Sequence, residues 1–141
     1  MIYTTNTKKA IKIAYSAHNG MVDKSGIPYI LHPIHLAEQM KTEETCIVAL
    51  LHDVVEDTSI TFEYLEKEFS EDVIEALKLL THDKAIPYMD YIKKIKDNPI
   101  AKAVKLADLN HNSDITRLDY VSKKDEERRE KYQKAIKLLT E

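Results

Sequence analysis

LLHDVVEDT, residues Leu50–Thr58, carries four titratable side chains within six positions of an otherwise apolar run. The preceding residues, Ile47 to Ala49, are also apolar, and a helix that is apolar on every side is usually buried inside a domain. No Lys or Arg lies between Lys41 and Lys67 to pair with the carboxylates, and an unpaired buried charge is strongly unfavourable. A divalent cation resolves this conflict best. Mixed imidazole and carboxylate ligands suit Mn, Fe, Zn or Ni more than Ca.

The spacing of these residues predicts one central helix from about Glu44 to Asp57. On it His52 and Glu56 are four residues apart, as are Asp53 and Asp57, so the side chains form two short columns on adjoining faces. An isolated His-Asp pair is more often a surface or helix-capping feature than a metal site. The apolar context and the second pair of carboxylates one turn later favour a metal site here.

The composition points to one domain, residues 1–141, in a reducing compartment. A chain of 141 residues can bury about two-thirds of its unfolded surface. With 21 basic and 24 acidic residues and no basic stripe, a nucleic-acid partner is not expected. The single cysteine, Cys46, excludes an internal disulfide. We find no apolar stretch of membrane-spanning length and no signal peptide, so we expect no membrane partner and a cytoplasmic location.

The rest of the chain is predicted to be helical. Apolar periodicity and capping residues indicate helices over about 4–17, 32–40, 44–57, 61–69, 70–81, 87–95, 100–111 and 125–139. No strand alternation and no internal repeat are found, so the expected fold class is all-α, a bundle of about seven to eight helices. Both glycines, Gly20 and Gly26, lie in the irregular segment between the first two helices, which is therefore a candidate binding loop.

Two more residues are candidates to complete the metal site. His32 opens a helix directly after the glycine-containing loop, and Asp108 lies in the apolar segment VKLAD. An aspartate in such a segment is more often exposed than bound. Together with His32, His52 and Asp53, however, Asp108 would give a set of four ligands with open positions for water and substrate, which is typical of a catalytic site.

Four other histidines compete for the same role. His35 occupies a polar position and is predicted to lie on the surface, and His82 lies in a hydrophilic break and is predicted to be in a loop. His18 is expected at a helix end near the binding loop. His111, close to Asp108, either hydrogen-bonds a ligand or is exposed.

Four segments, in this order and spacing, carry a family resemblance: AHNG with KSG (17–20 and 24–26), PYILHP (28–33), HDVVEDT (52–58) and KLAD (105–108). Together they resemble the HD-domain phosphohydrolases. More narrowly, they are similar to the hydrolase domain of the RelA/SpoT family and its small stand-alone alarmone hydrolases. The match extends over about residues 10–118, and the form His-Asp-x-x-Glu-Asp-Thr with an upstream His-Pro is its most specific part.

The resemblance implies an Mn²⁺-dependent helical HD domain that removes pyrophosphate from the 3′ position of guanosine tetra- or pentaphosphate. It also implies a role for each matching residue. The metal ligands would be His32, His52, Asp53 and Asp108; the groups that position and deprotonate water, or protonate the leaving oxygen, would be Glu56 and Asp57; and the substrate-binding residues would be Lys24, Ser25 and Asn112.

Three places depart from the family pattern, and one of them is the segment SDIT, residues 113–116, which differs from a more basic run in the family. Alarmone hydrolases usually carry an arginine that stacks on guanine where this chain has Asp23, and a carboxylate cannot make that cation–π contact and would repel phosphate. After Asp108 the family typically reads Arg-Leu-His-Asn, whereas this chain reads LNHN, without the basic residue. These departures leave the metal ligands intact and weaken the prediction of guanine as the base.

The sequence therefore predicts a metal-dependent phosphohydrolase of a nucleotide phosphate or pyrophosphate ester, with guanosine 3′-diphosphate 5′-di- or triphosphate as the leading substrate. The ion is expected to be Mn²⁺, with other divalent transition metals as alternatives. The alternative activities are a phosphatase of another nucleotide or phosphorylated metabolite, which Asp23 favours, and a non-catalytic HD domain that senses a nucleotide. The sequence does not specify an oligomeric state.

Overall fold

The computed structural model describes residues 1–141. Several of its helices are capped at the N-terminus by a hydroxyl or amide side chain that accepts a backbone N–H. In chain order the elements are α1 (Thr5–Ala17), α2 (Leu31–Glu38), α3 (Glu43–Leu51), α4 (Val54–Asp57), α5 (Phe62–Glu68), α6 (Glu71–Leu80), α7 (Tyr88–Lys96), α8 (Pro99–Asn112), the 3₁₀ turn η1 (Ile115–Arg117) and α9 (Lys123–Thr140). Eight of the helices have seven residues or more, and α4 is a single turn. The prediction of an all-α bundle of about seven to eight helices is confirmed.

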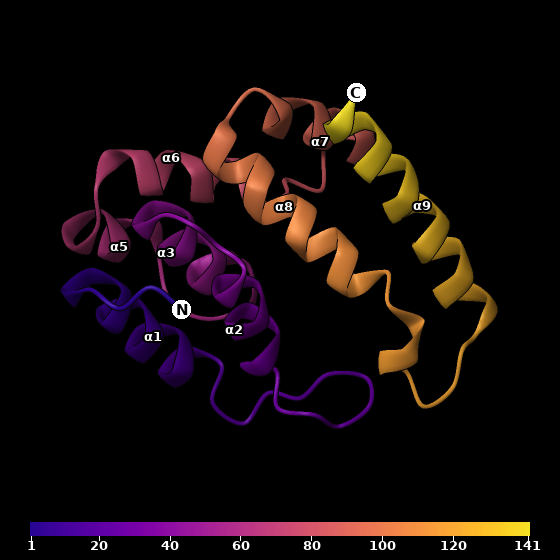
Figure 1. Cartoon of the computed structure of the whole chain (residues 1–141), viewed down its shortest axis with the longest axis horizontal. Helices are drawn as coiled ribbons and strands as arrows, with labels where there is room; N and C mark the ends of the chain where they lie inside the picture. The colour runs from indigo at the N-terminus through magenta and orange to yellow at the C-terminus, as the bar shows by residue number, and fades with distance from the viewer.

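Helix α3 is the centre of the bundle. All its residues from Cys46 to Leu51 are buried, and it packs against α1 and α2 on one side and against α6 and α8 on the other (Figure 1). Its first turn is fixed by a capping box in which Thr42 and Thr45 bond to each other's backbone N–H groups. The run that is apolar on every side is therefore buried on every side, as the sequence predicts.

The prediction of one continuous helix from about Glu44 to Asp57 is wrong. Helix α3 ends at Leu51, the chain turns at His52 and Asp53, and α4 follows as a separate turn. Nδ1 of His52 lies 2.7 Å from the carbonyl oxygen of Ala49, the acceptor that a continuing helix would use for its own backbone. The turn buries His52 and leaves Glu56 and Asp57 exposed, so the two side-chain columns do not form.

The segment between α1 and α2 is a tight loop that reaches the far end of α8. Gly20 and Gly26 adopt φ values of 82° and 79°, in the left-handed region that favours glycine. The carboxylate of Asp23 accepts the backbone N–H groups of Ser25 and Ile27 within the loop. In Figure 1 the loop extends toward the η1 turn, and the Ser25 hydroxyl donates to the carbonyl oxygen of Arg117 at 2.7 Å. Residues 92 positions apart in sequence are thus joined beside the end of α8.

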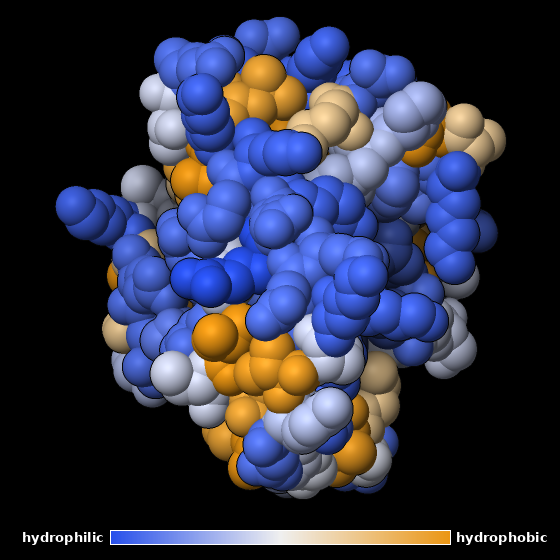
Figure 2. Space-filling view, turned by 90° about the vertical axis from the view of Figure 1, so that its right-hand side faces the viewer, coloured by the Kyte–Doolittle hydropathy of each residue, from blue (hydrophilic) through white to orange (hydrophobic).

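Helix α9 covers the side of the bundle that lies away from α1 and α2 (Figure 1). It runs beside α8 and also packs against α7, with Ala135 and Leu139 buried (Figure 1). Figure 2, which views the molecule from its α9 side, shows a mainly hydrophilic surface with small hydrophobic patches. The charged run of α9 is therefore largely a solvated face, as predicted. None of the helices is both long enough and apolar enough to span a bilayer.

Candidate metal centre and substrate cavity

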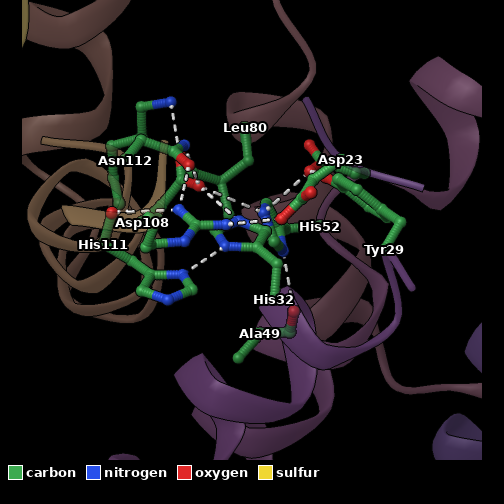
Figure 3. A network of polar contacts seen from close by, with 12 residues as sticks. Asp23, Tyr29, His32, Ala49, His52, Leu80, Asp108, His111 and Asn112 are labelled. Carbon is green, nitrogen blue, oxygen red and sulfur yellow. Dashed lines mark hydrogen bonds and ion pairs between the residues drawn. The ribbon is translucent and has the colours of Figure 1, made fainter. Parts of the chain in front are cut away.

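The four predicted metal ligands converge from three parts of the chain. His32 comes from the first turn of α2, His52 and Asp53 from the turn after α3, and Asp108 from α8. Figure 3 shows the side chains of His32, His52 and Asp108 directed toward one another. One ligand atom from each of His32, His52 and Asp53 lies within 4.8 Å of the others. Asp108 Oδ1 lies 2.9 Å from Nε2 of His32 and 3.4 Å from Nε2 of His52.

The ring of His52 points an unsatisfied nitrogen at two carboxylates. Since Nδ1 faces the Ala49 carbonyl oxygen, which can only accept, that nitrogen carries the proton and Nε2 of the neutral ring has only a lone pair. Nε2 is buried and has no hydrogen-bond partner, while Asp53 Oδ2 and Asp108 Oδ1 lie 3.1 and 3.4 Å away. Lone pairs that face carboxylate oxygens in a buried site require a cation or a proton between them, so the donor set fits a divalent metal.

The same geometry determines the protonation of His52. Burial alone would lower its pKa, but the charges of Asp53 and Asp108 raise the pKa of His52 well above its ordinary value. Burial raises the pKa of Asp53, yet the neighbouring His52 more than offsets this and lowers it to about 2. In the absence of a metal ion, a proton on His52 takes the place of the missing positive charge.

Asp108 is a buried carboxylate with partners on both of its oxygens. It is only 6% exposed, and its Oδ1 accepts a hydrogen bond from the Asn112 amide at 3.0 Å in addition to facing the two histidines. Its Oδ2 is 3.0 Å from the ammonium group of Lys105, one turn earlier on α8. Although burial raises the pKa of Asp108, Lys105 and the histidines hold it well below its usual range. The carboxylate is therefore ionised, with one oxygen directed at the metal centre.

Tyr29 supports the other aspartate. Its hydroxyl donates to Asp53 Oδ2, and its ring packs between His18 and His32, with ring centroids 4.9 and 5.7 Å away. Burial and the Asp53 charge raise the pKa of Tyr29, so the phenol keeps its proton and remains a donor. Ligands of metals in proteins are commonly oriented by such partners.

Of the four remaining histidines, only His111 contacts a candidate metal ligand. Nδ1 of His111 lies 2.7 Å from Nδ1 of His32, so of the two predicted alternatives it hydrogen-bonds a candidate ligand. Burial, followed by the charge of Arg117, lowers the pKa of His111 to about 4, so its ring is neutral. His35 is exposed, as predicted. His82 lies in the loop after α6, and His18 ends α1 beside the binding loop.

The two candidate proton-transfer groups, Glu56 and Asp57, are exposed side chains of α4, and of the two only Asp57 lines the cavity. Glu56 Oε1 accepts the backbone N–H of His82 at 3.1 Å, which ties α4 to the loop after α6. Asp57 faces the cavity beside the metal centre. Partial desolvation, together with the charges of Asp53 and Glu56, raises the pKa of Asp57 to about 6. Asp57 is thus able to exchange a proton near neutral pH.

A cavity of about 510 Å³ opens next to His32 and Asp57. All three predicted substrate-binding residues line it, namely Lys24, Ser25 and Asn112. Each also has a partner within the protein: Lys24 pairs with Asp125 at 2.9 Å, the Ser25 hydroxyl donates to Arg117, and Asn112 bonds Asp108. The structure brings the predicted residues to one place.

Sequence reasoning missed four residues of the site: Tyr29, Lys105, Arg117 and Asp125. Two of them stand inside the quoted segments PYILHP and KLAD, so their position next to a candidate ligand was a usable signal. Arg117 and Asp125 lie beyond these segments, and no spacing rule links them to the loop that they contact.

A family model described as "HD domain" matches residues 10–139. The chain belongs to the HD-domain family. The resemblance inferred from the four segments is therefore confirmed, and this family implies a divalent metal, which the His and Asp cluster fits.

Relatives of this HD domain carry the names of alarmone enzymes. It is 35% identical over 137 positions to a guanosine-3′,5′-bis(diphosphate) 3′-pyrophosphohydrolase of Borreliella burgdorferi, covering 85% of this chain and 20% of the relative. It is 36% identical over 121 positions to the bifunctional (p)ppGpp synthase/hydrolase SpoT of Escherichia coli, covering 74% of this chain and 17% of the relative. The chain thus spans about a fifth of the length of these curated relatives.

A solved structure extends the similarity over the whole fold. It is described as a metazoan ortholog of SpoT that hydrolyzes ppGpp. The two structures have a TM-score of 0.77 at 27% sequence identity, covering 99% of this chain and 85% of the other. The HD domain described here therefore matches most of that chain, unlike the longer relatives.

Proposed function

We propose that this HD domain is a metal-dependent phosphohydrolase that releases pyrophosphate from the 3′ position of guanosine 3′,5′-bis(diphosphate). The names of the relatives support this substrate, and the similarity to a hydrolase over 85% of that hydrolase's chain supports the reaction. The observation that carries the proposal is the buried Nε2 of His52, which faces the carboxylates of Asp53 and Asp108 without a hydrogen-bond partner. A purely structural helical domain gains nothing from that arrangement.

In this proposal His32, His52, Asp53 and Asp108 hold the metal, with Mn²⁺ as the preferred ion. A bound divalent ion lowers the pKa of water and offsets charge on phosphoryl oxygens. Lys105 holds Oδ2 of Asp108, while Oδ1 faces His32 and His52, the side on which the metal would lie.

Asp57 and Glu56 are proposed to handle protons. Asp57 faces the cavity and has a pKa raised to about 6, so its carboxylate can take a proton from the attacking water at neutral pH and later return it to the leaving oxygen. Glu56 is held by the backbone N–H of His82, which leaves its second carboxylate oxygen available to orient water. Lys24, Ser25 and Asn112 are proposed to contact the part of the substrate that occupies the cavity.

The test is a substrate-panel assay of purified protein reconstituted with Mn, Mg, Fe, Co, Ni or Zn, with products separated by chromatography and metal content measured by elemental analysis. We expect metal-dependent release of pyrophosphate from guanosine 3′,5′-bis(diphosphate). Asp53→Ala should abolish both activity and metal retention, whereas Asp90→Ala, a change at an exposed aspartate of α7, should leave both intact. Wild-type turnover in Asp53→Ala would remove Asp53 from the site.

A second candidate substrate class is another nucleotide or phosphorylated metabolite. The observation that favours it is Asp23, whose carboxylate lines the cavity where a cation would be expected for guanine stacking. The same panel decides between the two: release of phosphate from another compound, with no turnover of the guanosine compound, would select the second class. Stoichiometric metal without turnover of any compound would indicate a nucleotide sensor.

A further inference from the structure

Every cationic side chain of the large cavity is already paired with a carboxylate. The Lys and Arg residues that line it are Lys24, Arg117 and Arg128. Lys24 and Arg128 both contact Asp125 Oδ1, at 2.9 and 3.1 Å. Nη2 of Arg117 lies 3.8 Å from Asp23 Oδ2. No lysine or arginine in the cavity wall is left free for an additional phosphate.

The guanidinium of Arg117 is occupied on its other side as well. Nη1 donates to the carbonyl oxygen of His111 at 3.0 Å and to the side-chain oxygen of Asn112 at 3.3 Å. A phosphate that approached its N–H groups would displace protein acceptors and meet the Asp23 carboxylate. The smaller adjoining cavity, of about 290 Å³, offers no alternative, because Arg117 is its only lysine or arginine.

Carboxylates outnumber these cations. Asp23, Asp57, Asp114 and Asp125 line the large cavity, against its three lysine and arginine side chains. Asp125 is only 11% exposed and is further held by the backbone N–H of Ser122, so it does not swing away from the cavity without breaking the first turn of α9. Outside the metal centre, the cavity is therefore close to electrically neutral or slightly negative.

We propose that this cavity selects against charge at the end of the substrate remote from the scissile ester. The preferred substrates are then nucleoside 3′-diphosphates with one 5′-phosphate rather than two or three. This inference rests on the proposed function for the place of the scissile group at the metal centre. A like-charge contact at about 4 Å corresponds to about a fivefold change in an equilibrium constant in water and to more near a protein surface, so each added 5′-phosphate should lower kcat/KM by about fivefold or more.

The experiment measures kcat/KM for guanosine 3′-diphosphates with one, two and three 5′-phosphates at one fixed salt concentration. Wild type should rank them in that order. Asp125→Asn releases Lys24 and Arg128 yet retains an oxygen that accepts from Ser122, so it should raise kcat/KM for the 5′-triphosphate by about tenfold and change the 5′-monophosphate far less. Asp23→Asn, which keeps an acceptor for the loop N–H groups and releases Arg117, should act in the same direction.

The matched control is Glu130→Gln, which removes one negative charge from the outer face of α9, outside the cavity. It should leave the ranking unchanged, and thermal unfolding of all variants checks that the α9 cap is intact. Equal or rising kcat/KM with added 5′-phosphates, or the same ratio of kcat/KM between the 5′-triphosphate and the 5′-monophosphate in Asp125→Asn as in wild type, would overturn the inference while leaving the hydrolase activity standing.

Absence of turnover of all three compounds would instead overturn the proposed function. The inference is then decided by calorimetric binding of inorganic tripolyphosphate to the metal-free proteins. Asp125→Asn should bind this anion at least about threefold more tightly than wild type and Glu130→Gln. Equal affinities in the three proteins would overturn the inference.

Discussion

Lys105→Met is the most informative single change near the metal centre, because it removes the fixed positive charge that balances Asp108. The ammonium group lies 3.0 Å from Asp108 Oδ2, and the two side chains are 13% and 8% exposed. Met fills most of the volume of the lysine stem, so the substitution tests the charge rather than the packing.

The magnitude follows from the burial of the pair. Removal of one partner of a buried ion pair costs about 3–5 kcal/mol, because the other charge is left uncompensated. Asp108 keeps His32, Asn112 and a protonated His52 as neighbours, so we expect the lower end, about 3 kcal/mol for the metal-free protein. For a chain of this size that corresponds to a fall in Tm of about 6–12 °C.

A bound divalent ion should reverse much of this loss. In wild type the ion and Lys105 both compensate Asp108 and repel each other, whereas in Lys105→Met the ion alone compensates the carboxylate. The rise in Tm on addition of saturating Mn²⁺ should therefore be larger in Lys105→Met than in wild type. The assay is thermal unfolding followed by circular dichroism, with chelator and with Mn²⁺.

Lys102→Met is the matched control for this cycle, since Lys102 lies one turn earlier on α8 and makes no ion pair. It should change stability by no more than about 0.5 kcal/mol. A Lys105→Met protein as stable as this control, or a smaller rise in Tm with Mn²⁺ than in wild type, would refute the assignment of Lys105 as the counter-charge of Asp108.

Three further predictions concern the metal centre and its rim. Glu56→Gln should keep the metal and slow turnover by about 100-fold or more, as expected for impaired proton transfer, and loss of the metal would make Glu56 a ligand instead. Carboxylates raise the pKa of His52, so its Nε2 proton must leave before a metal binds. The affinity for Mn²⁺ should therefore rise with pH, by up to about tenfold per pH unit below that pKa. A calorimetric affinity that does not change with pH would contradict this. Tyr29→Phe, which removes the donor to Asp53, should weaken Mn²⁺ binding by about tenfold, and Tyr15→Phe at an exposed position should not.

The buried core of the fold and the four candidate ligands were predictable from local patterns. The apolar run up to Leu51 is buried as its composition requires, and His52 and Asp108 are buried because each stands in an apolar segment. What failed was the continuation of the helix through Asp53. Helical periodicity extends equally well across that position, and the competing contact of the His52 ring with the Ala49 carbonyl oxygen is not visible in a pattern of apolar and polar residues. The cytoplasmic location and the preference for Mn²⁺ stay predictions.

The charge balance of the cavity was beyond sequence reasoning for a different reason. Asp23 taken alone indicates a site that repels phosphate, and Lys24 taken alone indicates one that attracts it. Their effects are decided by Arg117 and Asp125, about 100 residues later, which the fold brings against the loop. Local sequence identifies which groups are present, whereas the net field that a substrate meets depends on which of them neutralise each other. Around this cavity the pairing leaves no lysine or arginine uncompensated, so selectivity among substrates should depend on the charge of the part that lies outside the metal centre.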